Sequence, residues 1–222
     1  MKIFFITISL TFSFFTLQSQ TMISFTESQD YDESRYRDIK ESPYLFKTFI
    51  DGYIIGINDT EYDKVSTNFN AYTEEIEVRK GNKFIRLDEK FYKSVLLKLE
   101  DGKDMKMIRG IHPFFRGKFI EVLYQEGNTY LTRKHTVKIS ETSVNNVGRK
   151  ETFRRFIKKK ELYLVTGTGS EDIQLLKTKK KKLLKVLGKK DELTNYIKKE
   201  KIDLSSDEGL VSLIKYWISL EE

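Results

Sequence analysis

The chain has 222 residues, of which 39% are apolar and 13% aromatic, and its formal net charge at pH 7 is +7. This apolar content is too high for a disordered chain, and the length is sufficient for one domain with a sizeable core. Cysteine is absent, which excludes disulfide bonds, a thiol nucleophile and thiolate metal ligands.

Residues 1–20 have the layout of a secretory signal peptide. Lys2 precedes an apolar run from Ile3 to Leu17, and small or polar residues follow. A membrane anchor has a similar layout, but this run is shorter than the ~20 residues that a spanning helix needs. We therefore expect cleavage before Gln20 and an exported protein, soluble in the periplasm or outside the cell.

Residues 21–42 are polar and charged, with weak periodicity. We expect a flexible N-terminal segment that ends in a short helical turn. Docking of this segment on the body or on a partner is the alternative. Residues 43–222 are expected to form a single domain, with a β body over 43–176 and a helical cap over 177–222.

From Tyr44 onward, apolar residues alternate with polar ones, and Gly-bearing turn dipeptides interrupt the pattern. The segment 46–57 is expected to be one strand, or two that join at Asp51–Gly52. The best hairpin signal is Glu126-Gly127-Asn128. The remaining expected strands are 64–73, 74–79, 84–87, 91–99, 105–111, 114–124, 129–139, 152–157, 162–165 and 173–176.

The C-terminal part changes to helical spacing. Helices are expected over 179–187, with Gly188 as the stop, and over 191–201. A last helix should begin at Ser205, because Ser205 and Glu208 have capping-box spacing, and should bury a stripe that includes Trp217. The predicted fold class is α+β: an antiparallel β meander, a roll or an incomplete barrel, followed by two or three C-terminal helices.

Candidate catalytic or metal-binding groups are sparse. His112 and His135 are the only histidines, and we expect both on the surface or in turns rather than in a metal site. The Gly167–Ser170 segment lacks the Lys and Ser or Thr ending of a phosphate-binding loop, so a hairpin turn is expected there. No serine lies in a GxSxG elbow. We therefore expect no catalytic residues, no metal and no cofactor.

Positive charge is concentrated in one region. Residues 149–190 contain 15 basic and 4 acidic residues, a net charge of +11, whereas 21–148 and 191–222 are net negative. The segment 177–190 should form a structural helix that buries Leu183, Leu184 and Leu187 and leaves its lysines in water. A solvated face is the simpler interpretation, and contact with an anionic partner is the alternative. The residues predicted for such a contact are Arg154, Arg155, Lys158, Lys159, Lys160, Lys179, Lys180, Lys181 and Lys182.

Several short segments carry a resemblance to known sequences. They are Ser42-Pro43-Tyr44-Leu45, Gly52-Tyr53-Ile54, Asn68-Phe69-Asn70-Ala71-Tyr72, Gly117 to Leu123 and the ending that starts at Leu183. Together they make residues 42–220 similar to exported, signal-peptide-bearing proteins of unknown function from Bacteroidota-type bacteria. The resemblance implies a location in the cell envelope and supplies no functional residue.

The leading hypothesis is a non-enzymatic cell-envelope (periplasmic) protein that binds another macromolecule, such as an accessory subunit of an outer-membrane complex. A second hypothesis is a binder of anionic lipid or glycan through residues 149–190. A third is a hydrolase that uses carboxylates. A nucleic-acid partner is disfavoured because the lysine-rich run has no interleaved aromatic residues or arginines.

Overall fold

The structure is a computed structural model, and it describes residues 33–221 except 82, 89 and 147–148. The expected signal peptide and the first part of the expected flexible segment lie outside the described residues. The strands are β1 (Ile39–Lys40), β2 (Ile50–Gly56), β3 (Glu61–Asn70), β4 (Glu75–Lys80), β5 (Lys83–Arg86), β6 (Tyr92–Lys98), β7 (Asp104–Ile108), β8 (Ile120–Glu126), β9 (Thr129–Asn146), β10 (Arg149–Val165) and β11 (Ile173–Leu176). The helices are α1 (Lys180–Leu187), α2 (Lys190–Lys199) and α3 (Asp207–Ser219), with 3₁₀ turns η1 (Glu33–Tyr36), η2 (Pro113–Phe115) and η3 (Ser170–Asp172).

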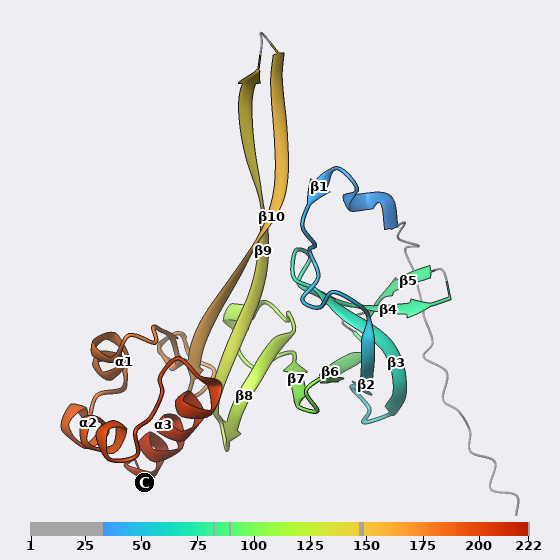
Figure 1. The fold of residues 1–222 in the computed structure, drawn as a ribbon. Helices are drawn as coiled ribbons and strands as arrows, with labels where there is room; N and C mark the ends of the chain where they lie inside the picture. The colour runs from blue at the N-terminus through green and yellow to red at the C-terminus, as the bar shows by residue number, and fades with distance from the viewer. Residues whose placement is uncertain (1–32, 82, 89, 147–148, 222) are drawn as a thin grey trace, which may run out of the picture.

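The strands form one open sheet in the order β1-β10-β9-β8-β7-β6-β2-β3-β4-β5, and β11 also pairs with β10. Only β1 runs parallel to its neighbour; the other pairs are antiparallel. Three helices follow the strands at the C-terminal end (Figure 1). The predicted α+β class is therefore confirmed, as an open, mostly antiparallel sheet that does not close into a barrel.

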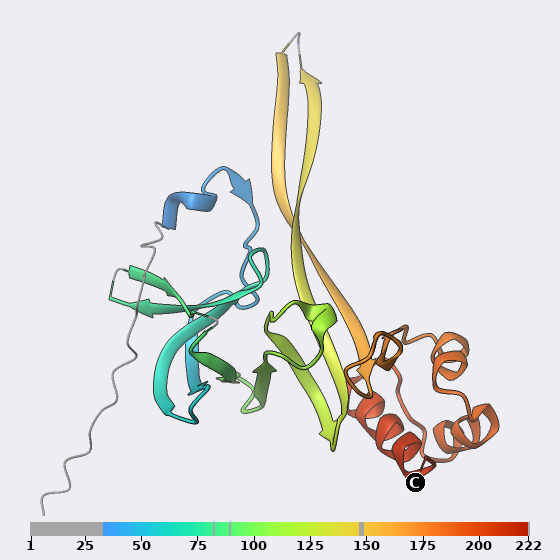
Figure 2. The ribbon, with the colours of Figure 1, turned by 180° about the vertical axis from the view of Figure 1, so that it is seen from behind.

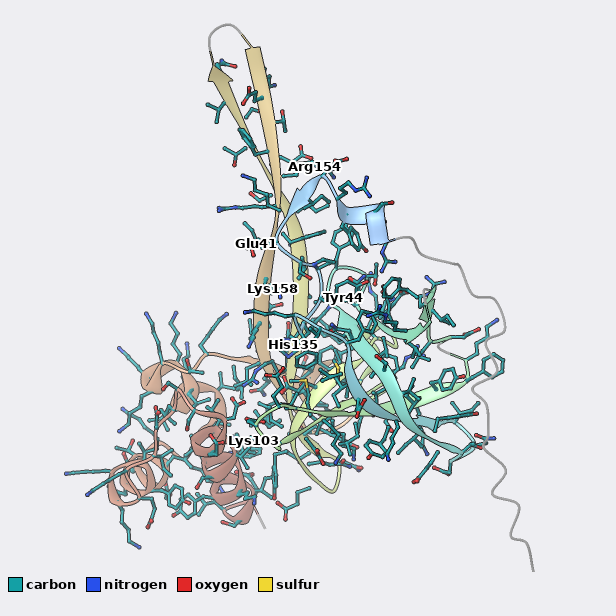
Figure 3. All side chains as sticks on the ribbon, turned by 45° about the vertical axis from the view of Figure 1, so that its right-hand side comes forward. Glu41, Tyr44, Lys103, His135, Arg154 and Lys158 are labelled. Carbon is teal, nitrogen blue, oxygen red and sulfur yellow. The ribbon has the colours of Figure 1, made fainter. Side chains whose placement is uncertain are left out.

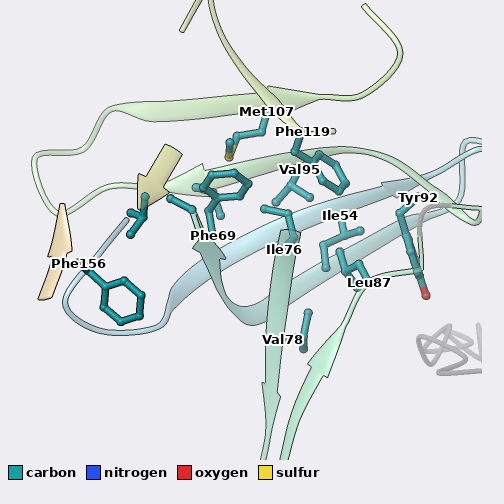
Figure 4. Close-up of a cluster of buried hydrophobic side chains, with 13 residues drawn as sticks. Ile54, Phe69, Ile76, Val78, Leu87, Tyr92, Val95, Met107, Phe119 and Phe156 are labelled. Atoms are coloured by element: carbon teal, nitrogen blue, oxygen red, sulfur yellow. The ribbon is translucent and has the colours of Figure 1, made fainter. Parts of the chain in front are cut away.

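The N-terminal half of the sheet curls around an apolar core. Strands β2 to β7 contribute Ile54, Phe69, Ile76 and Met107, all fully buried, as Figure 4 shows. Gly52 lies inside β2, where an added Cβ would lie 2.3 Å from Thr67 Cγ2 on β3. Of the two expected arrangements of 46–57, a strand that continues through Asp51–Gly52 is the one that forms, and this glycine permits close packing of β2 against β3.

A second core joins the helices to the sheet. Leu183, Leu184 and Leu187 of α1 are buried with Leu162 and Leu164 of β10, and the lysines of α1 point into solvent. This confirms the expected structural helix, and Gly188 ends it with a φ of 69°. Figure 2 shows α3 against the lower ends of β9 and β10, and its stripe buries Leu210, Leu213 and Ile214 and half-buries Trp217.

Strands β9 and β10 extend far beyond the rest of the sheet as a two-stranded ribbon (Figures 1 and 2). β10 is continuous from Arg149 to Val165, so the two expected strands around Lys158–Lys160 are one strand. Each lysine of the run is in register with a β9 residue, and this pairing outweighs the low strand propensity of lysine. We call the part of the ribbon at residues 138–159 the arm; its tip, 147–148, lies outside the described residues.

Two further expectations are corrected and a third is confirmed. Phe114 belongs to η2 rather than to a strand, because Pro113 starts the turn and His112 caps it by accepting from the Phe114 N–H at 3.1 Å. The cap of α3 is Ser206, which accepts from the Gly209 N–H, and not Ser205. The hairpin expected at Gly167–Ser170 is confirmed, since β11 folds back on β10 after η3.

Candidate functional site

The arm is the feature of this fold that the cores do not explain. Above the Glu141–Arg154 pair, β9 and β10 pair only with each other in the described residues. Figure 3 shows the side chains above Arg154 projecting away from the body on both sides of the ribbon. A two-stranded ribbon alone is marginally stable in water, so its conformation depends on the anchored base.

One face of the arm carries all of its exposed large apolar residues. In the β9–β10 register, alternate rows place Val144, Phe153 and Ile157 on the same side. Their exposed fractions are 48%, 43% and 44%. Arg155, Lys138 and Lys159 share this side, and the Lys40 ammonium lies 5.2 Å from the centre of the Phe153 ring. We call this side the apolar face of the arm.

The opposite side of the arm is polar where it leaves the body. Ser143 Oγ and Thr152 Oγ1 lie 3.2 Å apart, and Arg154 Nε lies 3.1 Å from Glu141 Oε1. Both pairs connect residues directly across β9 and β10, so the polar groups satisfy one another. The arm is therefore amphipathic, with self-paired polar groups on one side and uncovered apolar groups on the other.

The base of the arm is firmly attached to the body. Phe156 is 3% exposed and contacts the rings of Tyr36 and Tyr72, with centroids 5.3 and 5.5 Å away. Lys158 Nζ donates to the Tyr44 carbonyl at 2.6 Å, and partial burial lowers the pKa of its ammonium group. Strand β1 pairs with Arg154 and Arg155, so the described end of the expected flexible segment packs on the arm.

The predicted basic residues fall into two separate groups. Arg154, Arg155 and Lys158–Lys160 lie on β10, and Lys179–Lys182 lie at the start of α1. Leu162 packs with the α1 leucines, and Arg154 is eight residues further along the extended strand, a separation of roughly 26 Å. This exceeds the Debye length of about 8 Å at physiological salt, so Arg154 and Arg155 act independently of the α1 lysines, whereas Lys160 lies only two residues from Leu162.

A buried carboxylate holds the N-terminal segment in place. Glu77 on β4 is 1% exposed and accepts hydrogen bonds from Arg35 Nη2 at 2.5 Å, the Tyr44 hydroxyl at 2.6 Å and Asn70 Nδ2 at 2.8 Å. Burial and the hydrogen bond to Glu77 raise the pKa of the Tyr44 phenol. Sequence analysis missed this group because Arg35 and Glu77 are 42 residues apart.

A second polar group links the sheet to α3. Both histidines are buried. His112 lies in a turn, as expected, whereas His135 lies within β9, contrary to expectation, with Nε2 2.6 Å from Glu121 Oε2. Arg133 lies 3.4 Å from the same carboxylate and makes a two-point contact with Asp207. The Arg133 hydrogen bond lowers the pKa of the Asp207 carboxyl below its usual range. His112 is elsewhere, with Nε2 2.8 Å from the Gly169 carbonyl.

Metal-ligand clusters and cavities are the remaining features to consider. Within residues 33–221, apart from 82, 89 and 147–148, no three His, Asp or Glu side chains are grouped closely enough to hold a metal ion. One cavity of about 290 Å³ is lined by charges of both signs, including Glu74, Glu75, Arg86 and Lys118. Glu75 pairs there with Arg86 and Lys118, at 3.2 and 3.8 Å, so the cavity is largely charge-balanced.

Comparisons with known proteins add no constraint: no family model, curated protein or solved structure gives a match to this chain. The helices among the described residues are all too short or too polar to cross a membrane.

Proposed function

We propose that the protein is a non-enzymatic component of the cell envelope that binds another macromolecule through the arm. The observation that carries this proposal is the apolar face, where Val144, Phe153 and Ile157 are each more than 40% exposed on a projecting ribbon. The signal-peptide layout of residues 1–20 supports the location. Within the envelope, we propose that the protein is an accessory subunit of an outer-membrane complex.

The composition of the apolar face fits a protein partner. Interfaces commonly have aromatic and apolar residues at the centre and a charged rim in which arginine is enriched. Phe153 and Val144 occupy the centre here; Arg155, Lys138 and Lys40 lie on the side toward the body, and one acid, Glu151, lies opposite Val144. The basic rim favours an acidic partner, because complementary charge accelerates association and selects against basic surfaces.

A comparison of two double variants tests this proposal. V144S with F153S removes apolar groups from the apolar face, whereas S143A with T152A alters the polar side of the arm in the row between them. Tagged proteins would be isolated from native envelopes in mild detergent, and co-purified proteins quantified by mass spectrometry. We expect the wild type and the S143A/T152A variant to retain one stoichiometric partner, and the V144S/F153S variant to lose it at least tenfold (about 1.4 kcal/mol). Recovery of the wild type alone, or equal retention by both variants, would contradict the proposal.

A second candidate function is binding of an anionic lipid or glycan through residues 149–190. The observation that favours it is the charge of β10, where residues 149–160 include seven basic residues and one acidic residue. Binding to vesicles that contain phosphatidylglycerol should fall steeply with salt. An immobilised acidic polysaccharide distinguishes glycan from lipid.

Two charge variants locate such a site. Because the basic groups are far apart, Arg154→Gln with Arg155→Gln tests the arm, and Gln at Lys179–Lys182 tests α1. At ~1 kcal/mol for each charge, the arm variant should bind anionic vesicles roughly 30-fold more weakly if the arm is the site. If both variants bind as the wild type does, the basic residues form only a solvated face.

A further inference from the structure

The outer edge of β9 is an open hydrogen-bonding edge. The Val137 N–H donates to the Ala71 carbonyl at 2.8 Å, so the edge groups of residue 137 point away from β10. Backbone groups alternate along a strand, and Ile139, Glu141, Ser143 and Asn145 therefore present their N–H and C=O outward. In the described residues no strand pairs with this part of the edge.

This edge lacks the features that usually prevent strand pairing. Residues 138–146, KISETSVNN, contain no proline and no glycine, and their one lysine and one glutamate cancel. Natural edge strands are commonly protected by prolines, charges, bulges or short length. Residues 141–145 are exposed. They include Thr142 and Val144, which are β-branched and therefore favour the extended conformation.

The two edges of the arm differ in what they can bind. The β10 edge is occupied by β1 at Arg154 and Arg155, and the strand itself is strongly basic. A second basic strand would be repelled from it. The β9 edge is free and neutral, so a strand of the same sequence can approach without a charge penalty.

We propose that the β9 edge pairs antiparallel with the β9 edge of a second copy of this chain, to form a two-fold symmetric dimer. This goes beyond the proposed function, which uses the apolar face and a different molecule. Two-fold dimers are the commonest closed assemblies, and a two-fold axis needs only one self-complementary edge.

The outward groups define the register of the dimer. With Thr142 opposite Thr142 of the second copy, Glu141 lies opposite Ser143 and Ile139 opposite Asn145. All outward groups of these four residues then find partners, in about eight hydrogen bonds. A shift that places Glu141 opposite Glu141 of the second copy would oppose like charges. The pairing ends at Ile139, just before Val137, whose N–H already binds Ala71.

The dimer brings two further features together. Thr142 would face its counterpart as a non-hydrogen-bonded pair with Cα atoms about 4.5 Å apart, within the range for a disulfide. Phe153 pairs with Thr142 across the arm, so both apolar faces would lie on one side of a four-stranded ribbon. A partner could then contact both copies at once.

Cysteine cross-linking tests the register, because the chain has no native cysteine. Thr142→Cys should form a disulfide-linked dimer under mild oxidation, whereas Thr152→Cys on β10 should not. Equal cross-linking of the two variants would overturn the proposed register. Both positions are exposed, so neither change should disturb folding.

The mass of the protein in solution tests the dimer itself. Ser143→Pro removes one outward N–H without removing a β9–β10 hydrogen bond, and Ser143→Ala is its matched control. By light scattering, the wild type and Ser143→Ala should be dimers and Ser143→Pro a monomer. A wild type that stays monomeric at about 1 mM, or a dimeric Ser143→Pro, would overturn the proposal. Partner capture by the Ser143→Pro monomer then shows whether the proposed function holds independently of the dimer.

Discussion

The arm and helix α1 are both strongly basic, but their apolar residues lie in opposite environments. In α1, Leu183, Leu184 and Leu187 are buried and the lysines merely cover the outer surface. In the arm, Val144, Phe153 and Ile157 remain exposed beside arginines and lysines. A basic segment with buried apolar residues has a complete structural explanation, whereas one with exposed apolar residues implies a further contact. The arm, rather than the lysine run of α1, is therefore the better candidate for a binding site.

The largest expected contrast between the two regions is in stability. Leu183 is fully buried, so Leu183→Ala should lower the free energy of unfolding by about 3 kcal/mol, from lost burial and the cavity left behind. Phe153→Ala should cost less than about 1 kcal/mol, because the ring contributes mainly its contact with Lys40. Urea unfolding of the two variants measures both. Similar losses of unfolding free energy in the two variants would show that the arm is part of the folding core, contrary to the contrast between the arm and α1.

A smaller contrast concerns pH, because the helical end has an ion pair to the sheet. The Asp207 carboxyl has a pKa lowered by its hydrogen bond from Arg133. The Asp207 carboxyl therefore stabilises the folded state fully above its pKa in the unfolded chain, about 3.9. This stabilisation is lost as the pH falls through the lower pKa that the carboxyl has in the folded protein. Between pH 6 and pH 3, the wild type should lose more stability than Asp207→Asn, by less than about 1 kcal/mol because the Asp207 side chain is partly exposed.

Urea unfolding at the two pH values, with Asp203→Asn as a matched control, checks this expectation. Asp203 also has a pKa lowered by hydrogen bonds of Ser205, and these bonds join two residues of the same loop rather than α3 to the sheet. Equal pH dependence of Asp207→Asn and the wild type would contradict a role for Asp207 in attaching α3.

The smallest expected effect is on the exposed lysines of α1. Replacement of Lys179–Lys182 with Gln should change the free energy of unfolding by less than about 0.5 kcal/mol, since all four are exposed. Partner capture by this variant should equal that of the wild type. A loss of partner binding by this variant would place the binding site on α1 instead of on the arm.

The fold could be anticipated where local signals dominate. Alternating apolar residues predicted the antiparallel strands. Gly188 marked the end of α1, and the expected start at residue 179 is one residue before the observed start at Lys180. Local signals failed where pairing between distant strands decided the outcome. Lys158–Lys160 form a strand because β9 pairs with them along their whole length. The choice between one strand and two at Asp51–Gly52 was left open, and the pairing of β2 with β3 and β6 decides it.

The candidate site was anticipated only in part. Arg154 and Arg155 were selected by charge, but the exposure of Val144, Phe153 and Ile157 could not be read from an alternating pattern that equally describes a buried strand. A period-two pattern says which residues share a face, not whether anything covers that face. The burial of His135 depends on Glu121, which is fourteen residues away on the neighbouring strand.

Shortening the arm tests the central claim most directly. Ser140 and Arg155 form a hydrogen-bonded pair across β9 and β10, so residues 141–154 can be replaced by Asn-Gly, a two-residue turn that closes the same register. The shortened protein should unfold within about 1 kcal/mol of the wild type, because the removed residues contribute nothing to either core, yet it should lose its envelope partner. A shortened protein that fails to fold, or that keeps the partner at the wild-type level, would contradict the account.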